Sequence, residues 1–407
     1  MSPSGGTSYR AVLSVPCARR LFLTAALGRL AYAILPLGLL LSVAQATSFT
    51  TAGLVAAATG ATIVLAGPWR AGLVDRYGRR ALIPLMLGYV AGNVVLLIAL
   101  RWEAPVVALV AIGALTGASP PPLGPSMRVM WSRLVDREDV QRAYALDAVT
   151  EEVLFTTGPL VTGVLVGVFS PQSAVLAGVC VLAVGTVAFV SSPGPGAATG
   201  EAAGSAEQGP PESPLRAAGF VRALVMLAGV SSAMSLVYVG VPVIATQAGH
   251  PAVAGPLEAA IAAGSAVGGL LYGRRAWRRP LGYRLNVVCL ALAAVVAGLA
   301  AAGGTWWLLV PGLFAAGMCL SPALIIAYSI GDTVVAPAAR TRASIWVNTA
   351  GNAGGTAGAM LAGVLADRLP AQALFLIAGI VLAGVVAAAG RSAHRGTQKE
   401  LAGAAGR

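Results

Sequence analysis

The chain has 407 residues, of which 57% are hydrophobic and only 10% are charged. Ordinary soluble domains carry about a quarter of charged residues, so the composition excludes a water-soluble globule and predicts an all-α polytopic membrane protein. The formal net charge of +12 comes from arginines in short segments between apolar runs, which argues against nucleic acid as a partner.

Twelve apolar segments follow one another, each with about the 20 residues that an α-helix needs to cross a bilayer. The first follows a polar segment, residues 1–18, and we expect it to be retained because it is longer than a signal-peptide core and lacks a convincing cleavage site. The predicted spans are residues 21–44, 49–69, 81–100, 104–127, 143–169, 172–191, 220–246, 253–273, 283–302, 305–330, 343–366 and 370–390.

Arginine is concentrated in alternate connections between these spans. One side holds most of it, including Arg76, Arg274 and Arg340, whereas the other side holds only Arg101 and Arg368. Basic residues next to spans mark the cytoplasmic side, so the N-terminal tail 1–18 and the C-terminal tail 392–407 are both predicted in the cytoplasm. The preference for arginine over lysine, with abundant Ala and Gly, suggests a GC-rich bacterial genome and hence a bacterial cell membrane.

A stretch of Pro, Gly, Ser, Ala and Glu, residues 192–217, is too polar to pack and is predicted to be a flexible cytoplasmic linker. It separates two halves of six spans, residues 19–191 and 218–391. A shift of 200 positions matches Arg142 to Arg342 and Gly158 to Gly358, so the halves look like copies. Two parallel six-helix repeats with pseudo-symmetry are typical of one class of transporter.

The segment between spans two and three, Ala71–Arg80, is predicted to be a short basic loop. Its sequence Asp75-Arg-Tyr-Gly-Arg-Arg80 resembles the signature of the major facilitator superfamily, except that the first glycine, Gly72, is displaced by one position. A second motif in span five, Gly158-Pro159 with Gly163, is similar to the signature of the antiporter branches. The arginine that the family carries early in span four is absent.

This resemblance implies the twelve-helix fold of the family and a cytoplasmic gate. The gating residues would be Gly72, Asp75, Arg76, Gly78, Arg79, Arg80 and Arg128. In relatives the loop aspartate, here Asp75, latches onto the start of span eleven and onto a basic residue that ends span four, for which Arg128 is the candidate. The alternative is that Asp75 only offsets its arginine neighbours.

Charged residues inside spans are costly and mark candidate pathways. Arg29 lies in span one, and Glu151 and Glu152 lie in span five, which is a neighbour of span one in the family. Adjacent glutamates point about 100° apart on a helix, so only one can pair with Arg29 and the other could exchange protons. Alternatively, both glutamates reach the headgroups or form a structural cluster with Arg29 and Asp147.

A substrate cavity is expected where the family builds it, on spans one, seven, ten and eleven. An aromatic and methionine-rich wall there would suit an apolar or amphipathic compound, although core packing is an alternative for each residue. The candidates are Tyr32, Met234, Tyr238, Met318, Tyr328, Trp346, Asn348 and Asn352.

These features predict a secondary transporter that exports a small apolar or amphipathic compound in exchange for protons. An importer or uniporter of a metabolite and a sensor that does not transport are the alternatives. We expect no enzyme activity, since His250 and His394 lie far apart, and no cofactor or metal, since the four cysteines show no metal-ligand spacing. The expected partners are the bilayer, the substrate and protons, and the expected state is a monomer.

Overall fold

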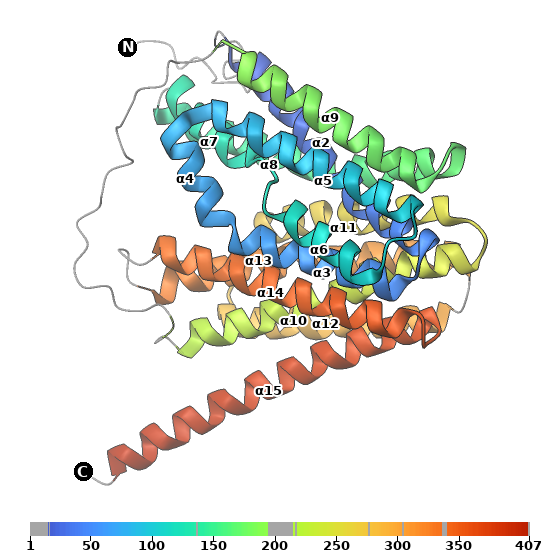
Figure 1. Ribbon diagram of the computed structural model, residues 1–407. Coiled ribbons are helices and arrows are strands. Elements are labelled where there is room, and N and C mark those ends of the chain that lie inside the picture. The colour runs from blue at the N-terminus through green and yellow to red at the C-terminus, as the bar shows by residue number, and fades with distance from the viewer. Residues whose placement is uncertain are drawn as a thin grey trace. The chain divides into compact units, whose positions relative to one another are not determined.

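The computed structural model describes residues 15, 17–135, 137–193, 215, 218–275, 277–302, 305–335 and 340–405 (Figure 1). Most of the predicted N-terminal tail, residues 1–18, and most of the predicted linker, residues 192–217, lie outside these ranges. All regular elements in the described part of the chain are helices, as the apolar composition predicts.

The first compact unit contains the helices up to the linker, apart from the start of α3. Its helices are α2 (Ala18–Ala46), α3 (Phe49–Leu65), α4 (Gly67–Tyr77), the 3₁₀ turn η1 (Gly78–Ala81), α5 (Leu82–Arg101), α6 (Val106–Gly117), α7 (Leu123–Leu134), α8 (Arg137–Val168) and α9 (Pro171–Ser191). Residues 48–57, which include the start of α3, pack with the second unit instead.

The second unit contains the remaining helices. They are α10 (Ala218–Gln247), η3 (Pro251–Val253), α11 (Ala254–Arg274), α12 (Leu281–Leu299), η4 (Ala300–Ala302), α13 (Trp306–Val334), α14 (Arg340–Ala366) and α15 (Ala371–Ala405). In Figure 1, α15 is a single long helix that leads to the C-terminus.

The helices correspond to the twelve predicted spans. In the described part of the chain, nine are long and apolar enough to cross a membrane, and the bent pair α3 and α4 brings the number to ten. The remaining two predicted spans, 104–127 and 343–366, coincide with α6 plus α7 and with α14. Prolines interrupt the first of these between Gly117 and Leu123, and glycine and asparagine make the second less apolar.

Helices α2 and α9 pack most closely in the first unit and lie side by side in Figure 1. A Cβ atom built on Gly185 of α9 would lie only 2.2 Å from the backbone nitrogen of Gly28 in α2. The two backbones therefore approach so closely that only glycine fits. Leu21, Trp131, Phe189 and their neighbours form the buried core around this contact.

Glycines also set the two closest helix pairs of the second unit. A Cβ atom on Gly354 of α14 would lie 2.1 Å from the carbonyl oxygen of Ala228 in α10. Likewise, Cβ atoms on Gly264 and Gly268 of α11 would lie 2.0 and 2.2 Å from carbonyl oxygens of α13. Small residues thus let the backbones of spanning helices touch, as in other membrane bundles.

The basic segment Ala71–Arg80 is not the loop that we predicted. Helix α4 continues through it to Tyr77, and the 3₁₀ turn η1 then connects directly to α5. Helices α3 and α4 meet at a bend of 49°. Pro68 lies in the first turn of α4, where proline is tolerated, so a new helix starts directly after the bend.

A second difference lies at the C-terminus. Helix α15 extends through most of the predicted tail 392–407, because its Ala, Lys and Glu residues favour helix.

Gly78 ends α4 with φ 61° and ψ −150°, a conformation that essentially only glycine adopts. We expect Gly78→Ala to lower the free energy of unfolding by about 1–3 kcal/mol, the usual cost of such strain. Gly72 is a matched control, because it lies within α4 and a Cβ atom there would meet nothing within 4 Å. Gly72→Ala should be neutral or stabilising by roughly 0.5–1 kcal/mol. Denaturant unfolding in detergent micelles checks both, and equal losses would contradict the prediction.

Candidate functional site

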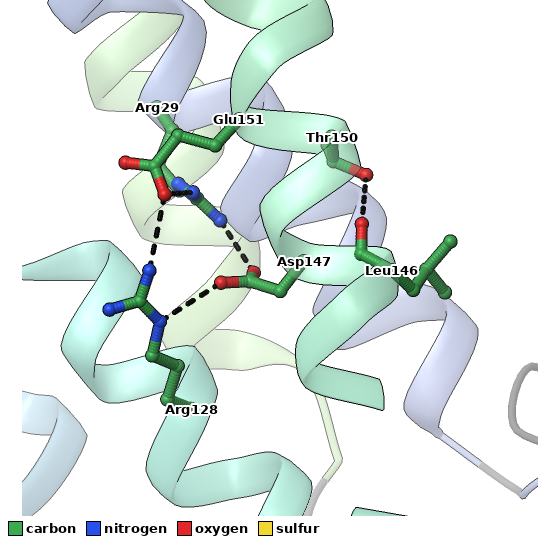
Figure 2. Close-up of polar contacts among 6 residues, drawn as sticks. All are labelled: Arg29, Arg128, Leu146, Asp147, Thr150 and Glu151. Carbon is green, nitrogen blue, oxygen red and sulfur yellow. Dashed lines mark hydrogen bonds and ion pairs between the residues drawn. The ribbon is translucent and has the colours of Figure 1, made fainter. Parts of the chain in front are cut away.

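Four charged side chains from three helices of the first unit meet in one cluster (Figure 2). Asp147 and Glu151 lie one turn apart on the same face of α8 and point toward Arg29 of α2 and Arg128 of α7. Arg29 Nη1 donates to Asp147 Oδ1 at 2.6 Å, and Arg29 Nη2 lies 3.0 Å from Glu151 Oε2. Arg128 Nε donates to Asp147 Oδ2 at 3.2 Å, and Arg128 Nη2 donates to Glu151 Oε2 at 3.1 Å.

The cluster has a buried end and a half-exposed end. The side chain of Asp147 is 0% exposed and that of Arg29 is 6% exposed, whereas Glu151 is 39% and Arg128 is 50% exposed. Two acids and two bases cancel in charge, which allows Arg29 and Asp147 to be ionised in a buried position. Glu151 is therefore the more exposed of the two carboxylates in the cluster.

A small cavity of about 30 Å³ lies beside the half-exposed end of the cluster. It is lined by Arg29, Tyr32, Ala33, Glu151, Leu154 and Phe155. A volume of this size holds one or two water molecules, provided that polar groups are available to bind them. The guanidinium of Arg29, the hydroxyl of Tyr32 and the carboxylate of Glu151 supply such groups.

The structure brings Arg29 and Glu151 together, so Glu151 is the glutamate that pairs with Arg29. Two further residues, Asp147 and Arg128, join this pair. Asp147 had entered only in the structural alternative, and it makes the most buried contact of the cluster. Arg128 had been assigned to the gate as a partner of Asp75, and here it contacts Asp147 and Glu151. The side chains of Asp75 and Glu152 lie outside the described part of the structure.

The motif Gly158-Pro159 lies two turns after Glu151, where α8 crosses α2. A Cβ atom on Gly158 would lie 2.3 Å from the Cβ atom of Ala33. The hydroxyl of Thr162 donates to the carbonyl oxygen of Ile34 at 3.1 Å and continues the same contact. Pro159 lies inside α8, and Gly163 is buried in it. The motif therefore packs α8 against the helix that carries Arg29.

The described gating residues lie around the elbow between α4 and α5. Arg79 Nη1 donates to the carbonyl oxygens of Phe189 at 3.2 Å and Ser192 at 3.1 Å, which fastens the elbow to the end of α9. Arg76 lies over the ring of Tyr77, 5.3 Å from its centre. Arg80 is exposed and lines a surface groove next to Tyr77.

The predicted cavity residues occupy both units. In the first unit, the hydroxyl of Tyr32 donates to the carbonyl oxygen of Pro121, and its ring meets that of Tyr89 edge-on. In the second unit Met234 is buried, and the other candidates are partly or well exposed. These are Tyr238, Met318, Tyr328, Trp346, Asn348 and Asn352.

Arg70 is a functional candidate that sequence reasoning missed. It lies on α4 just after the bend, and its guanidinium donates to the carbonyl oxygens of Pro120 and Ile63. Pro120 lies in the break between α6 and α7, and Ile63 lies near the end of α3. Arg70 thus donates hydrogen bonds to backbone carbonyl oxygens next to the interruptions of two helices. The hydrocarbon core of a bilayer offers no hydrogen-bond donors to such oxygens. The signal of Arg70 in the sequence was an arginine two residues after a proline at the end of an apolar run.

Asp367 was also missed, and it caps a helix within the second unit. Directly after α14, its carboxylate accepts from the backbone N–H groups of Phe49 at 3.2 Å and Thr50 at 2.7 Å. The hydroxyl of Thr50 donates to the carbonyl oxygen of Gly363 at 2.7 Å. A Cβ atom on Gly53 would lie 2.6 Å from the Cα atom of Gly363, so the start of α3 and the end of α14 are in backbone contact.

We expect Asp367→Ala to loosen this contact. Partial burial opposes ionisation of Asp367, but hydrogen bonds from Thr50, Ser48 and Phe49 outweigh it and hold its pKa below the ordinary value. The ionised form of Asp367, which caps the helix, is therefore favoured at any pH above the ordinary pKa of an aspartate. The cap is lost only as the pH falls through the lowered pKa of Asp367. Loss of a helix cap costs about 1 kcal/mol, so amide exchange at Phe49 and Thr50 should rise roughly fivefold at neutral pH.

Hydrogen exchange followed by mass spectrometry measures this effect. Asp332→Asn is the control, because Asp332 is an exposed aspartate of α13. After correction for intrinsic rates, exchange in the wild-type protein should stay constant between about pH 5 and 8, since Asp367 is ionised throughout. Unchanged exchange at the start of α3 in Asp367→Ala would contradict the capping role.

The comparisons with known proteins fit this architecture. The family model for the Major Facilitator Superfamily matches residues 21–359. Similar solved structures include the nucleoside transporter NupG, with 14% identity, a TM-score of 0.64, and 92% of this chain and 98% of that chain covered.

Two further structures are similar at the level of the fold. A bacterial homologue of the iron transporter ferroportin has 12% identity and a TM-score of 0.64, with 92% of this chain and 99% of that chain covered. A bacterial homologue of the human lysosomal transporter Spinster has 13% identity and a TM-score of 0.63, with 92% and 95% covered. No curated protein sequence matches the chain. The family model spans most of the chain, and the described helices follow the twelve-segment plan, so the chain belongs to the major facilitator superfamily.

Proposed function

We propose that the chain is a proton-coupled secondary transporter that exports a small apolar or amphipathic compound across a bacterial cell membrane. The observation that carries the proposal is the cluster of Arg29, Asp147, Glu151 and Arg128 next to a water-sized cavity. Ionisable groups inside a spanning helix are expensive, and they typically mark ion pathways.

Within the cluster, Asp147 and Glu151 have different tasks. Asp147 is fully buried between two guanidinium groups, and each of its oxygens pairs with one of them. We assign the exchangeable proton to Glu151 itself, the glutamate that pairs with Arg29, because its side chain is 39% exposed and uses one oxygen, Oε2, for both arginines. A proton on Glu151 removes its attraction to Arg29 and Arg128 and changes the cluster from neutral to a charge of +1.

This charge change is a means of switching between two states. The protonated cluster has an unpaired positive charge, which favours any arrangement in which that charge meets water or a new partner. Because Arg29, Glu151 and Arg128 belong to three different helices, loss of their ion pairs changes the contacts among α2, α7 and α8. Gly158, which packs α8 on α2, allows these helices to be in close contact in the ion-paired arrangement.

Two weaker features favour export of an apolar or amphipathic compound. The first is the Gly158-Pro159 motif, which is similar to that of the antiporter branches. The second is the aromatic and methionine-rich character of the candidate cavity residues, among them Met234, Met318 and Trp346. The solved structures of similar fold have different substrates in their names, so the compound is inferred from side-chain chemistry alone.

The test uses purified protein in liposomes with a pH-sensitive dye inside, and two amphipathic probes, ethidium and Hoechst 33342. We expect an outward gradient of either probe to drive proton entry in the wild-type protein. Glu151→Gln should abolish proton movement, whereas Glu103→Gln, a change at an exposed glutamate between α5 and α6, should leave it intact. Failure of both probes to move protons in folded wild-type protein, or equal proton movement in Glu151→Gln, would overturn the proposal.

A further inference from the structure

Glu258 is a buried carboxylate in the second unit that the cluster around Glu151 does not involve. It is the fifth residue of α11, a helix apolar enough to span the membrane, and its side chain is only 8% exposed. No described residue donates a hydrogen bond to it or forms an ion pair with it. An acid this deeply buried, with no partner in the described part of the chain, calls for a physical explanation.

The helices that pack against α11 provide no nearby cation. These are α13, α10 and the turn η3. Arg274 ends α11, sixteen residues or about 24 Å beyond Glu258. Arg222 lies near the start of α10, which runs antiparallel to α11 through a short connection, so it is at the opposite end of the helix pair.

None of the remaining titratable groups on these elements forms a described ion pair or hydrogen bond with Glu258. Asp332 lies at the far end of α13, which runs parallel to α11 because Gly264 meets Phe314 and Gly268 meets Met318. His250, at the start of η3, is exposed and makes no described contact with Glu258. The others are Tyr238 of α10, Tyr272 of α11, and Cys319 and Tyr328 of α13.

An unpaired carboxylate in such surroundings is more stable when neutral, because the charged form loses most of its hydration and has no described ion-pair partner. The positive end of the α11 dipole offsets only a small part of this loss, about 0.3–1 kcal/mol for an exposed group within the first turn. Neutralisation requires a proton on one carboxyl oxygen. A carboxylate that is protonated when dry releases the proton when water or a cation reaches it.

We propose that Glu258 is a second proton-binding site, located in the C-terminal unit and separate from the cluster of Arg29, Asp147, Glu151 and Arg128. It is protonated in the state described here and ionises in a state in which water enters the start of α11. Glu258 lies about 6 Å along the helix from its first residue, a distance that a modest rearrangement of α11 would open to solvent. Its participation in coupling rests on the proposed function, whereas proton binding itself does not.

Infrared spectroscopy of the protein in lipid films tests proton binding without any substrate. The carbonyl stretch of a protonated carboxyl in apolar surroundings is resolved from that of an ionised one. We expect a protonated-carboxyl band at neutral pH in the wild-type protein that is absent in Glu258→Gln and retained in Glu103→Gln and Glu151→Gln. A band unchanged by Glu258→Gln would overturn the proposal, even if Glu151→Gln abolishes proton flux.

The liposome assay with ethidium then tests the coupling role. We expect Glu258→Gln to fold and to reduce probe-driven proton entry at least tenfold. Loss of the infrared band with full proton entry would overturn the role in coupling. A bound Na⁺ or a cationic probe instead of a proton would appear as an ionised-carboxylate band at neutral pH and would also contradict the proposal. Because the infrared result does not depend on transport, failure of this inference is distinguishable from failure of the proposed function.

Discussion

Asp147→Leu is expected to lower the free energy of unfolding by about 3–5 kcal/mol, the usual effect of removing one partner from a buried ion pair. The reason is that Arg29, only 6% exposed, loses its hydrogen bond of 2.6 Å to its one fully buried partner and keeps only the half-exposed Glu151, at 3.0 Å. Arg29→Leu should cost a similar amount, because it leaves Asp147 with only the half-exposed Arg128. Unfolding in mixed micelles with increasing denaturing detergent measures these differences.

The double variant Arg29→Leu with Asp147→Leu separates charge pairing from packing. It removes both buried charges and leaves Arg128 paired with Glu151. We therefore expect it to lose much less than the sum of the single variants. Arg128→Leu is the exposed control and should cost no more than about 1 kcal/mol, since Arg128 is 50% exposed. Additive losses, or a larger loss in Arg128→Leu than in Arg29→Leu, would contradict this account of the cluster.

Gly158→Ala is expected to lower the free energy of unfolding by about 1–3 kcal/mol, as overpacking of a tight contact does. The added methyl would lie 2.3 Å from the Cβ atom of Ala33 and 2.7 Å from its carbonyl carbon, so α8 must move away from α2. Glu151 lies two turns earlier on α8, and its distance from Arg29 should increase as well. Proton movement in liposomes should therefore fall together with stability.

Gly384 of α15 is the matched control, because a Cβ atom there would meet nothing within 4 Å. Gly384→Ala should leave both stability and proton movement unchanged or slightly improved. Adding Ala33→Gly to Gly158→Ala should recover part of the loss, because it removes the nearest atom but leaves the backbone of residue 33 in place. A Gly158→Ala protein as stable as the wild type would show that α2 and α8 are not in close contact.

The arrangement of helices follows from patterns that are local in the sequence. Runs of about 20 apolar residues predict single helices, and the prolines after Gly117 predict a break in one of them. The repeat at a distance of 200 positions relates pairs of equivalent helices in the two halves. The continuation of α4 to Tyr77 escaped prediction because polar and basic residues at the end of a span look the same in a loop and in a helix. Only the backbone conformation at Gly78 shows where the helix ends.

The candidate site was predictable only in part. An arginine in α2 and acids in α8 can be paired from helix periodicity and the order of helices in the family. That Glu151 pairs with Arg29, and that Arg128 joins them, depends on how α7 and α8 pack against each other. Spacing along the sequence does not predict this packing. Glu258 and Asp367 are single acids next to apolar stretches, and their burial or capping depends on helices distant in the chain.

Release of protons on binding of a compound is the most direct measure of a coupling role for Glu151. Hoechst 33342 is added to purified protein in weakly buffered detergent solution, and protons are counted with a pH indicator. Starting from the protonated cluster, the wild-type protein and Glu103→Gln are predicted to release protons in proportion to bound dye, and Glu151→Gln is predicted to bind dye without releasing them. Equal proton release by Glu151→Gln and the wild-type protein would contradict proton coupling through the cluster.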